Sequence, residues 1–89
     1  MEWLTTKCTM VANLKLFIDR SIGAAAKKTA VYGQMCDAYD GIAQKVLLQE
    51  PISDEDAQKL ISSIKSCGAA DVGCIVSMLN LIRSPNPAS

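Results

Sequence analysis

The sequence has no histidine among its 89 residues, and this absence narrows the chemistry open to the chain. Histidine is the commonest general base in enzymes and the usual activator of a cysteine nucleophile. The sequence also lacks a glycine-rich phosphate loop and the ligand spacing of a calcium loop. We therefore expect a protein that is not an enzyme, with no catalytic residues, no cofactor and no metal site.

Long hydrophobic runs are missing as well. No stretch approaches the roughly 18–20 consecutive apolar residues of a membrane-spanning helix. The first residues include Glu2, Thr5, Thr6, Lys7 and Lys15, a composition unlike that of a secretion signal. We therefore expect a cytoplasmic protein, of the cell itself or of a host infected by a virus or phage, with no membrane partner.

The four cysteines, Cys8, Cys36, Cys67 and Cys74, include no Cys-x-x-Cys pair. A zinc site would need all four thiolates in an unusual arrangement, because the chain offers no imidazole. Small disulfide-stapled domains are denser in cysteine and richer in loops, whereas these residues lie within apolar helical patterns. We therefore expect buried, reduced thiols, while the sequence leaves open whether any of them pair.

An excess of one charge is absent too, since nine basic residues balance nine acidic ones. Residues 1–28 nevertheless carry five basic and two acidic side chains, and residues 29–89 carry four basic and seven acidic. Ordinary solvated helix faces explain this distribution, and the alternative is electrostatic complementarity within the fold or between two copies packed head to tail.

The basic N-terminal third also suggests an alternative function, that of a nucleic-acid-associated accessory protein. Its phosphate-contacting residues would be Lys15, Arg20, Lys27 and Lys28. Nucleic acid is the less favoured partner, because the net charge is zero and the chain has two arginines in all.

Apolar residues recur at three- and four-residue intervals through the first half of the chain, which predicts helices. We expect one helix over about 3–22 and a second over about 24–48, with Gly23 as a break or a bend between them. Gly33 and Gly41 either let another helix approach the second one closely or divide it into two shorter pieces, and the spacing favours the first interpretation.

The second half contains the clearest boundary signals. Pro51 ends the preceding helix, and Ser53 is the expected N-cap of a third helix that Gly68 terminates. Asp71 is the expected N-cap of a last helix over about 72–84. The expected fold is therefore all-α.

Apolar residues make up 49% of the chain and charged residues 20%, a balance typical of a folded protein. A chain of this length has room for one core. We expect a small antiparallel helical bundle of three to four helices, with residues 1–84 as a single domain and residues 85–89 as a flexible tail.

One short motif has a family likeness. Lys7-Cys8-Thr9-Met10-Val11 is similar to the start of the small helical polymerase cofactor of coronaviruses. The likeness covers these five residues and extends to no other motif, so it implies no fold, partner or site residue here.

The last helix gives the main signal for association, because its apolar residues leave almost no polar face. Tryptophan is enriched among interface hot spots, and methionine side chains adapt to irregular surfaces. We therefore predict a non-enzymatic protein-binding module, an adaptor, small inhibitor or complex subunit, that acts through apolar helix surfaces as a homodimer. Its partner would be another protein of unknown identity. The expected partner-binding residues are Trp3, Met10, Cys74, Met78, Leu81 and Ile82.

Overall fold

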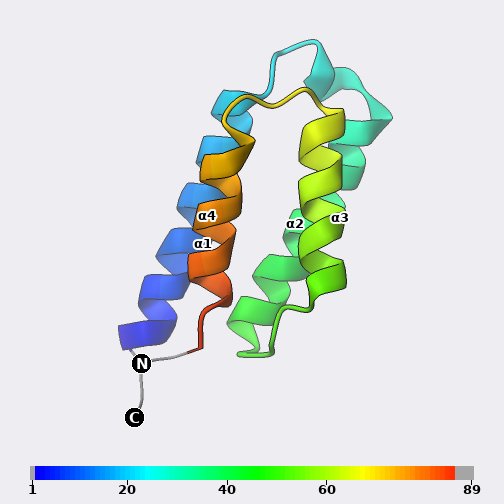
Figure 1. Cartoon of the computed structure of the whole chain (residues 1–89). Coiled ribbons are helices and arrows are strands. Elements are labelled where there is room, and N and C mark those ends of the chain that lie inside the picture. The colour runs from blue at the N-terminus through cyan, green and yellow to red at the C-terminus, as the bar shows by residue number, and fades with distance from the viewer. Residues whose placement is uncertain (1, 86–89) are drawn as a thin grey trace.

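The computed structural model describes residues 2–85, and this range forms four α-helices and one short 3₁₀ helix. The helices run alternately up and down in a bundle that measures 44 × 20 × 17 Å (Figure 1). The predicted all-α bundle is thus confirmed, with four helices. Of the predicted tail, residues 86–89 lie outside the described residues. The elements are α1 (Glu2–Ser21), η1 (Ala26–Lys28), α2 (Ala30–Leu47), α3 (Asp54–Ser66) and α4 (Val72–Arg83).

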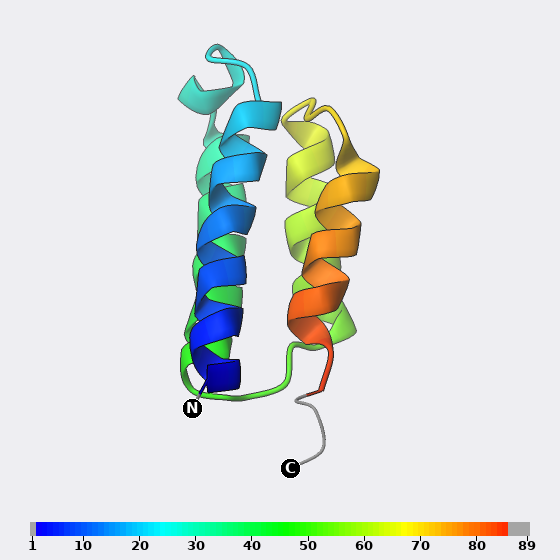
Figure 2. The ribbon, with the colours of Figure 1, turned by 90° about the vertical axis from the view of Figure 1, so that its left-hand side faces the viewer.

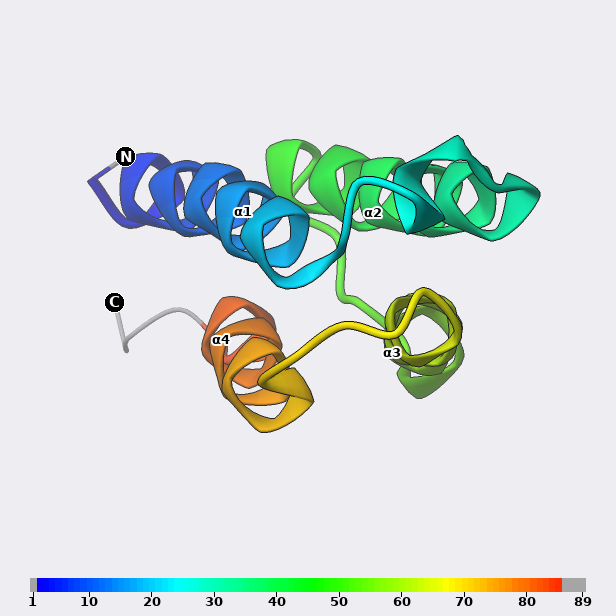
Figure 3. The ribbon, with the colours of Figure 1, turned by 90° about the horizontal axis from the view of Figure 1, so that it is seen from above.

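The four helices form two layers. Seen from above, α1 lies beside α2, with α4 below α1 and α3 below α2 (Figure 3). We call the end that holds the α1–α2 and α3–α4 connections the upper end, and the opposite end the lower end, as they stand in Figure 1. Helices α1 and α4 run antiparallel to each other (Figure 2), and hydrogen bonds join them near both ends. Lys7 Nζ donates to the Ser84 carbonyl at the lower end (2.5 Å), and the Ala70 amide donates to the Ser21 carbonyl at the upper end (3.0 Å).

The start of α2 differs from the prediction. Instead of helix from residue 24 onward, the chain makes the 3₁₀ turn η1 and then becomes extended at Thr29 (φ −98°, ψ 159°). The Thr29 hydroxyl accepts a hydrogen bond from the Tyr32 amide (3.4 Å) and so caps α2. The alanine run before this cap favours helix, but the cap sets the boundary.

The glycines of α2 do not serve the packing role that their spacing suggested. The helix runs unbroken through Gly33 and Gly41, so it is not divided into two pieces. A Cβ atom built at either position would meet nothing within 4 Å. Neither glycine therefore permits the close approach of another helix.

The boundaries of α3 match the sequence signals. The Ser53 hydroxyl accepts from the Asp56 amide (3.1 Å), and the Asp56 carboxylate accepts from the Ser53 amide (3.4 Å), which completes a capping box. Gly68 takes a positive φ of 72° just after the helix. Asp71 does precede α4, but it sits at φ 54° and its side chain makes no capping bond. Asp71 is therefore the N-cap residue of α4, as predicted, although its carboxylate accepts no capping hydrogen bond.

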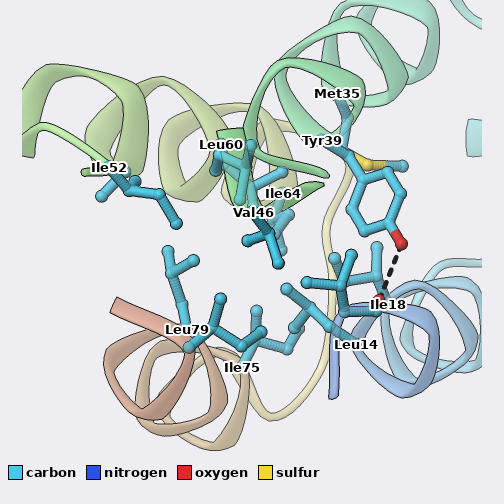
Figure 4. Packing of buried hydrophobic residues seen from close by; sticks show 14 of the residues in the cluster. Leu14, Ile18, Met35, Tyr39, Val46, Ile52, Leu60, Ile64, Ile75 and Leu79 are labelled. Carbon is cyan, nitrogen blue, oxygen red and sulfur yellow. Dashed lines mark hydrogen bonds between the residues drawn. The ribbon is translucent and has the colours of Figure 1, made fainter. Parts of the chain in front are cut away.

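The core lies between the two layers, where side chains from all four helices point inward (Figure 4). No polar or charged side chain is buried in the described range, apart from the tyrosine hydroxyl of Tyr39. That hydroxyl donates to the Val11 carbonyl (2.7 Å) and joins α2 to α1. No helix between residues 2 and 85 is long and apolar enough to cross a membrane. The large side chains with less than 2% exposure are Leu14, Ile18, Met35, Ile42, Leu60, Ile64, Ile75, Leu79 and Ile82.

Candidate protein-binding surfaces

One apolar line follows α1 on the side away from α2. Trp3, Met10 and Phe17 recur every seven residues, so they stack along one face of the helix. All three side chains are partly exposed, and Met10 and Phe17 also pack against the core. This line gives α1 an apolar edge that the core does not fully cover.

A second apolar line lies on α4. Cys74, Met78 and Leu81 share one face because they are four and three residues apart. The other flank of α4 turns toward α3, where the Arg83 guanidinium pairs with Asp54 (2.6 Å). The line of Cys74, Met78 and Leu81 therefore lies on the α1 side. We call the two lines together the α1/α4 surface.

The structure brings five of the six predicted partner-binding residues onto the α1/α4 surface. The sixth, Ile82, is 1% exposed, because it lies on the inward face of α4 with Ile75 and Leu79. Ile82 is a core residue, and its prediction as a contact residue is corrected. Phe17 was not predicted, although its seven-residue spacing from Met10 could have identified it.

Trp3 stands at the lower end of this surface. The Lys7 ammonium lies 5.6 Å from the centroid of its ring, within the range of a cation–π contact. The indole Nε1 is shielded from solvent and has no hydrogen-bond acceptor among residues 2–85. A buried donor without an acceptor lowers the stability of this end of the bundle.

A second apolar surface lies on the opposite side of α1, and the sequence reasoning missed it. It is a groove of about 210 Å³ between α1 and α2. Leu47, which is 63% exposed, borders the groove, and Leu16, which is 56% exposed, lies one turn beyond Ala12 on α1. We call this hollow the α1/α2 groove. Its lining residues are Cys8, Val11, Ala12, Tyr39, Ala43, Val46 and Leu47.

Above the groove, Lys15 of α1 contacts two tyrosine rings of α2. Its ammonium pairs with Asp19 (2.9 Å) and lies 5.9 and 6.0 Å from the ring centroids of Tyr32 and Tyr39. The Tyr32 hydroxyl donates to Asp19 as well (2.9 Å). The hydrogen bond to Asp19 raises the pKa of Lys15. Partial burial acts to raise the pKa of Asp19, but the hydrogen bonds from Lys15 and Tyr32 outweigh it and the pKa is lowered.

The four predicted nucleic-acid residues are not equivalent. Lys15 is engaged in the α1–α2 contact, whereas Arg20, Lys27 and Lys28 are exposed near the upper end. Three of the four are therefore exposed, Arg20 on α1 and Lys27 and Lys28 on η1.

The cysteines are all free thiols, but they differ in exposure. Cys67 is buried, and burial raises the pKa of its thiol. Cys8 and Cys36 are partly exposed and Cys74 is exposed, so the expectation of buried thiols is correct for Cys67 alone. Within the described part of the chain, no three His, Cys, Asp or Glu side chains are grouped to hold a metal ion.

The fold and these surfaces define a small four-helix bundle with apolar surfaces on both sides of α1. No family model, no curated protein and no solved structure matches the chain.

Proposed function

We propose that this chain is a non-enzymatic protein-binding module, an adaptor, small inhibitor or complex subunit, that works as a homodimer. The observation that carries the proposal is the α1/α4 surface, where apolar side chains remain in solvent. Leu81 is 60% exposed, and Cys74 is exposed beside it. Aligned exposed apolar residues favour association, because covering them removes apolar area from water.

The two apolar surfaces permit two simultaneous contacts. They lie on opposite flanks of α1, so a protein bound over Trp3 and Leu81 does not cover the groove beside Ala12. The partner would place apolar side chains along the α1/α4 surface, over Trp3 and Leu81. We assign the partner protein to the α1/α4 surface, because binding there leaves the groove beside Ala12 free for a second contact.

Site-specific photo-crosslinking in the native cells tests the proposal. A benzophenone amino acid would replace Leu81 in one variant and Ser62, an exposed residue of α3, in the matched control. We expect the Leu81 variant to give one discrete protein adduct that the control lacks, and Trp3→Ala to reduce its yield at least about tenfold. Identical adducts from both positions, or none from Leu81, would contradict binding through this surface.

A further inference from the structure

We infer that the α1/α2 groove is the docking site of a second copy of this chain, held antiparallel to the first. The inference rests on the homodimer proposed above and names its surface and orientation. Three features of the described residues carry it: the arrangement of exposed leucines around the groove, the small side chains that line it, and the charges at the two ends of the bundle.

The shape of this region is complementary to itself. Leu16 and Cys8 lie four residues to either side of Ala12 on α1, about 6 Å away in each direction. A twofold axis through the Ala12 level therefore exchanges the two positions. The protruding Leu16 of each copy then enters the hollow beside Cys8 and Leu47 of the other. A twofold interface makes this contact twice.

Small residues allow the two copies to come close. Ala12 of α1 and Ala43 of α2 both line the groove, and no charged side chain lines it. The hydroxyl of Tyr39 is already bonded to the Val11 carbonyl, so it needs no new partner when the groove is covered. Apolar burial here therefore leaves no polar group unpaired.

The charges select the antiparallel orientation. The upper end presents Arg20, Lys27, Lys28 and Lys65 against Asp71. At the lower end, Lys45 and Arg83 neutralise acidic side chains of the first turn of α3. The lower end also presents the exposed carboxylates of Glu50 and Glu55 against the ammonium of Lys7. An antiparallel pair places each basic end against an acidic end, whereas a parallel pair brings the two basic ends together.

Light scattering on a size-exclusion column, across a dilution series of the full chain, tests the inference. We expect the unmodified protein to be a dimer that dissociates on dilution. Leu16→Asp should weaken the dimer by at least about 100-fold in Kd, because each interface then buries two unpaired carboxylates. Ser62→Asp is the control, since Ser62 is exposed on α3 and lies outside both apolar surfaces. It should leave the Kd of the dimer unchanged, and circular dichroism would check that both variants keep their helices.

A charge exchange tests the orientation. Lys27→Glu with Lys28→Glu, and separately Glu50→Lys, should each shift the chain toward monomer at low salt. Mixing these two variants should restore the dimer, because each reversed end then meets an opposite charge on the other chain. Unchanged dimerisation in both single preparations would overturn the antiparallel arrangement.

The outcomes separate this inference from the proposed function. A dimer that survives Leu16→Asp but not Leu81→Asp would overturn the groove as the contact and keep the homodimer. A monomer at every concentration would overturn the homodimer together with the docking site. The monomer outcome leaves the crosslink from Leu81 as a separate test of binding to a different protein, whereas loss of the dimer in Leu81→Asp would predict a crosslink from Leu81 to a second copy.

Discussion

At the scale of single residues, the glycines of α2 lower the stability of the bundle, and neither helix packing nor backbone conformation requires them. Gly41 lies in the interior of the helix, is exposed to solvent and has free space where a Cβ atom would lie. Glycine loses more backbone freedom on folding than alanine does. Its conformation in α2 is one that any residue adopts.

We predict that Gly41→Ala raises the free energy of unfolding by about 1 kcal/mol. Gly68→Ala should do the opposite, because the φ of 72° at that position favours glycine. Urea unfolding followed by circular dichroism measures both changes. Equal effects of the two substitutions would contradict the different backbone conformations described here.

The exposure of individual residues could be predicted on α1 but not on α4. Polar residues of α1 mark its outer face, so Leu14 and Ile18 follow from periodicity as core residues. Eight of the twelve residues of α4 are apolar, so periodicity does not select its inner face. The prediction therefore placed Ile82 on the surface together with Leu81, although the two residues lie on different sides of the helix.

At the scale of elements, the start of α3 combines a local cap with a contact from another helix. Asp56 closes the capping box with Ser53 and also pairs with Lys45 of α2. The hydrogen bond from Lys45, followed by that from Ser53, lowers the pKa of Asp56 below its ordinary value of 3.8. A carboxyl whose pKa is lower in the folded state stabilises the protein above pH 3.8, and this contribution is lost as the pH falls through the folded pKa.

We therefore predict a pH-dependent effect for Asp56→Asn. The substitution should lower the urea midpoint at pH 7, and the difference from the unmodified protein should shrink as the pH is lowered below 3.8. Ser53→Ala should cost about 1 kcal/mol through loss of the cap. Urea titrations at pH 7 and pH 3 would compare the two. A difference for Asp56→Asn that stays constant between these values would contradict a lowered pKa of Asp56 in the folded state.

Helix boundaries could be predicted where a single residue type favours a helix start or a helix end. Pro51, Ser53 and Gly68 end or start helices as expected. The α1–α2 connection was not predictable in the same way, because alanines that favour helix precede a threonine that caps it. Local signals conflict at that point, and the cap at Thr29 sets the boundary.

At the scale of the whole molecule, one core shared by all four helices stabilises the fold, and the free energy of unfolding of so small a protein is low. A protein of this size has a free energy of unfolding on the order of 5–15 kcal/mol. Leu14 is fully buried, and it packs in the same cluster as side chains from the other three helices. Removing its side chain leaves a cavity that the surrounding helices fill only in part.

We predict that Leu14→Ala lowers the free energy of unfolding by about 2–5 kcal/mol. Leu48→Ala, at a position that is 58% exposed, should change it by less than about 0.5 kcal/mol. Thermal unfolding by calorimetry would compare both variants with the unmodified chain. A small effect of Leu14→Ala would mean that the core is less tightly packed than described.

The two surfaces differ in how far the sequence could predict them. The α1/α4 surface was largely predicted, because Trp3 and the apolar excess of α4 are visible in the sequence. The α1/α2 groove arises only when Cys8 and Ala12 meet Ala43 and Leu47 across two antiparallel helices. Small residues at separate points of a sequence carry no sign of the hollow that they form together.

The hydrogen bond from Lys7 to the Ser84 carbonyl places the start of α1 beside the end of α4. A linker that joined these two helices would therefore run along the lower end of the bundle. Circular permutation follows as a property of the fold: the chain could be opened at the exposed Ala24–Ala25 and rejoined at its lower end. The same proximity makes the bundle suitable for insertion into a surface loop of another protein, where its entry and exit points would lie side by side.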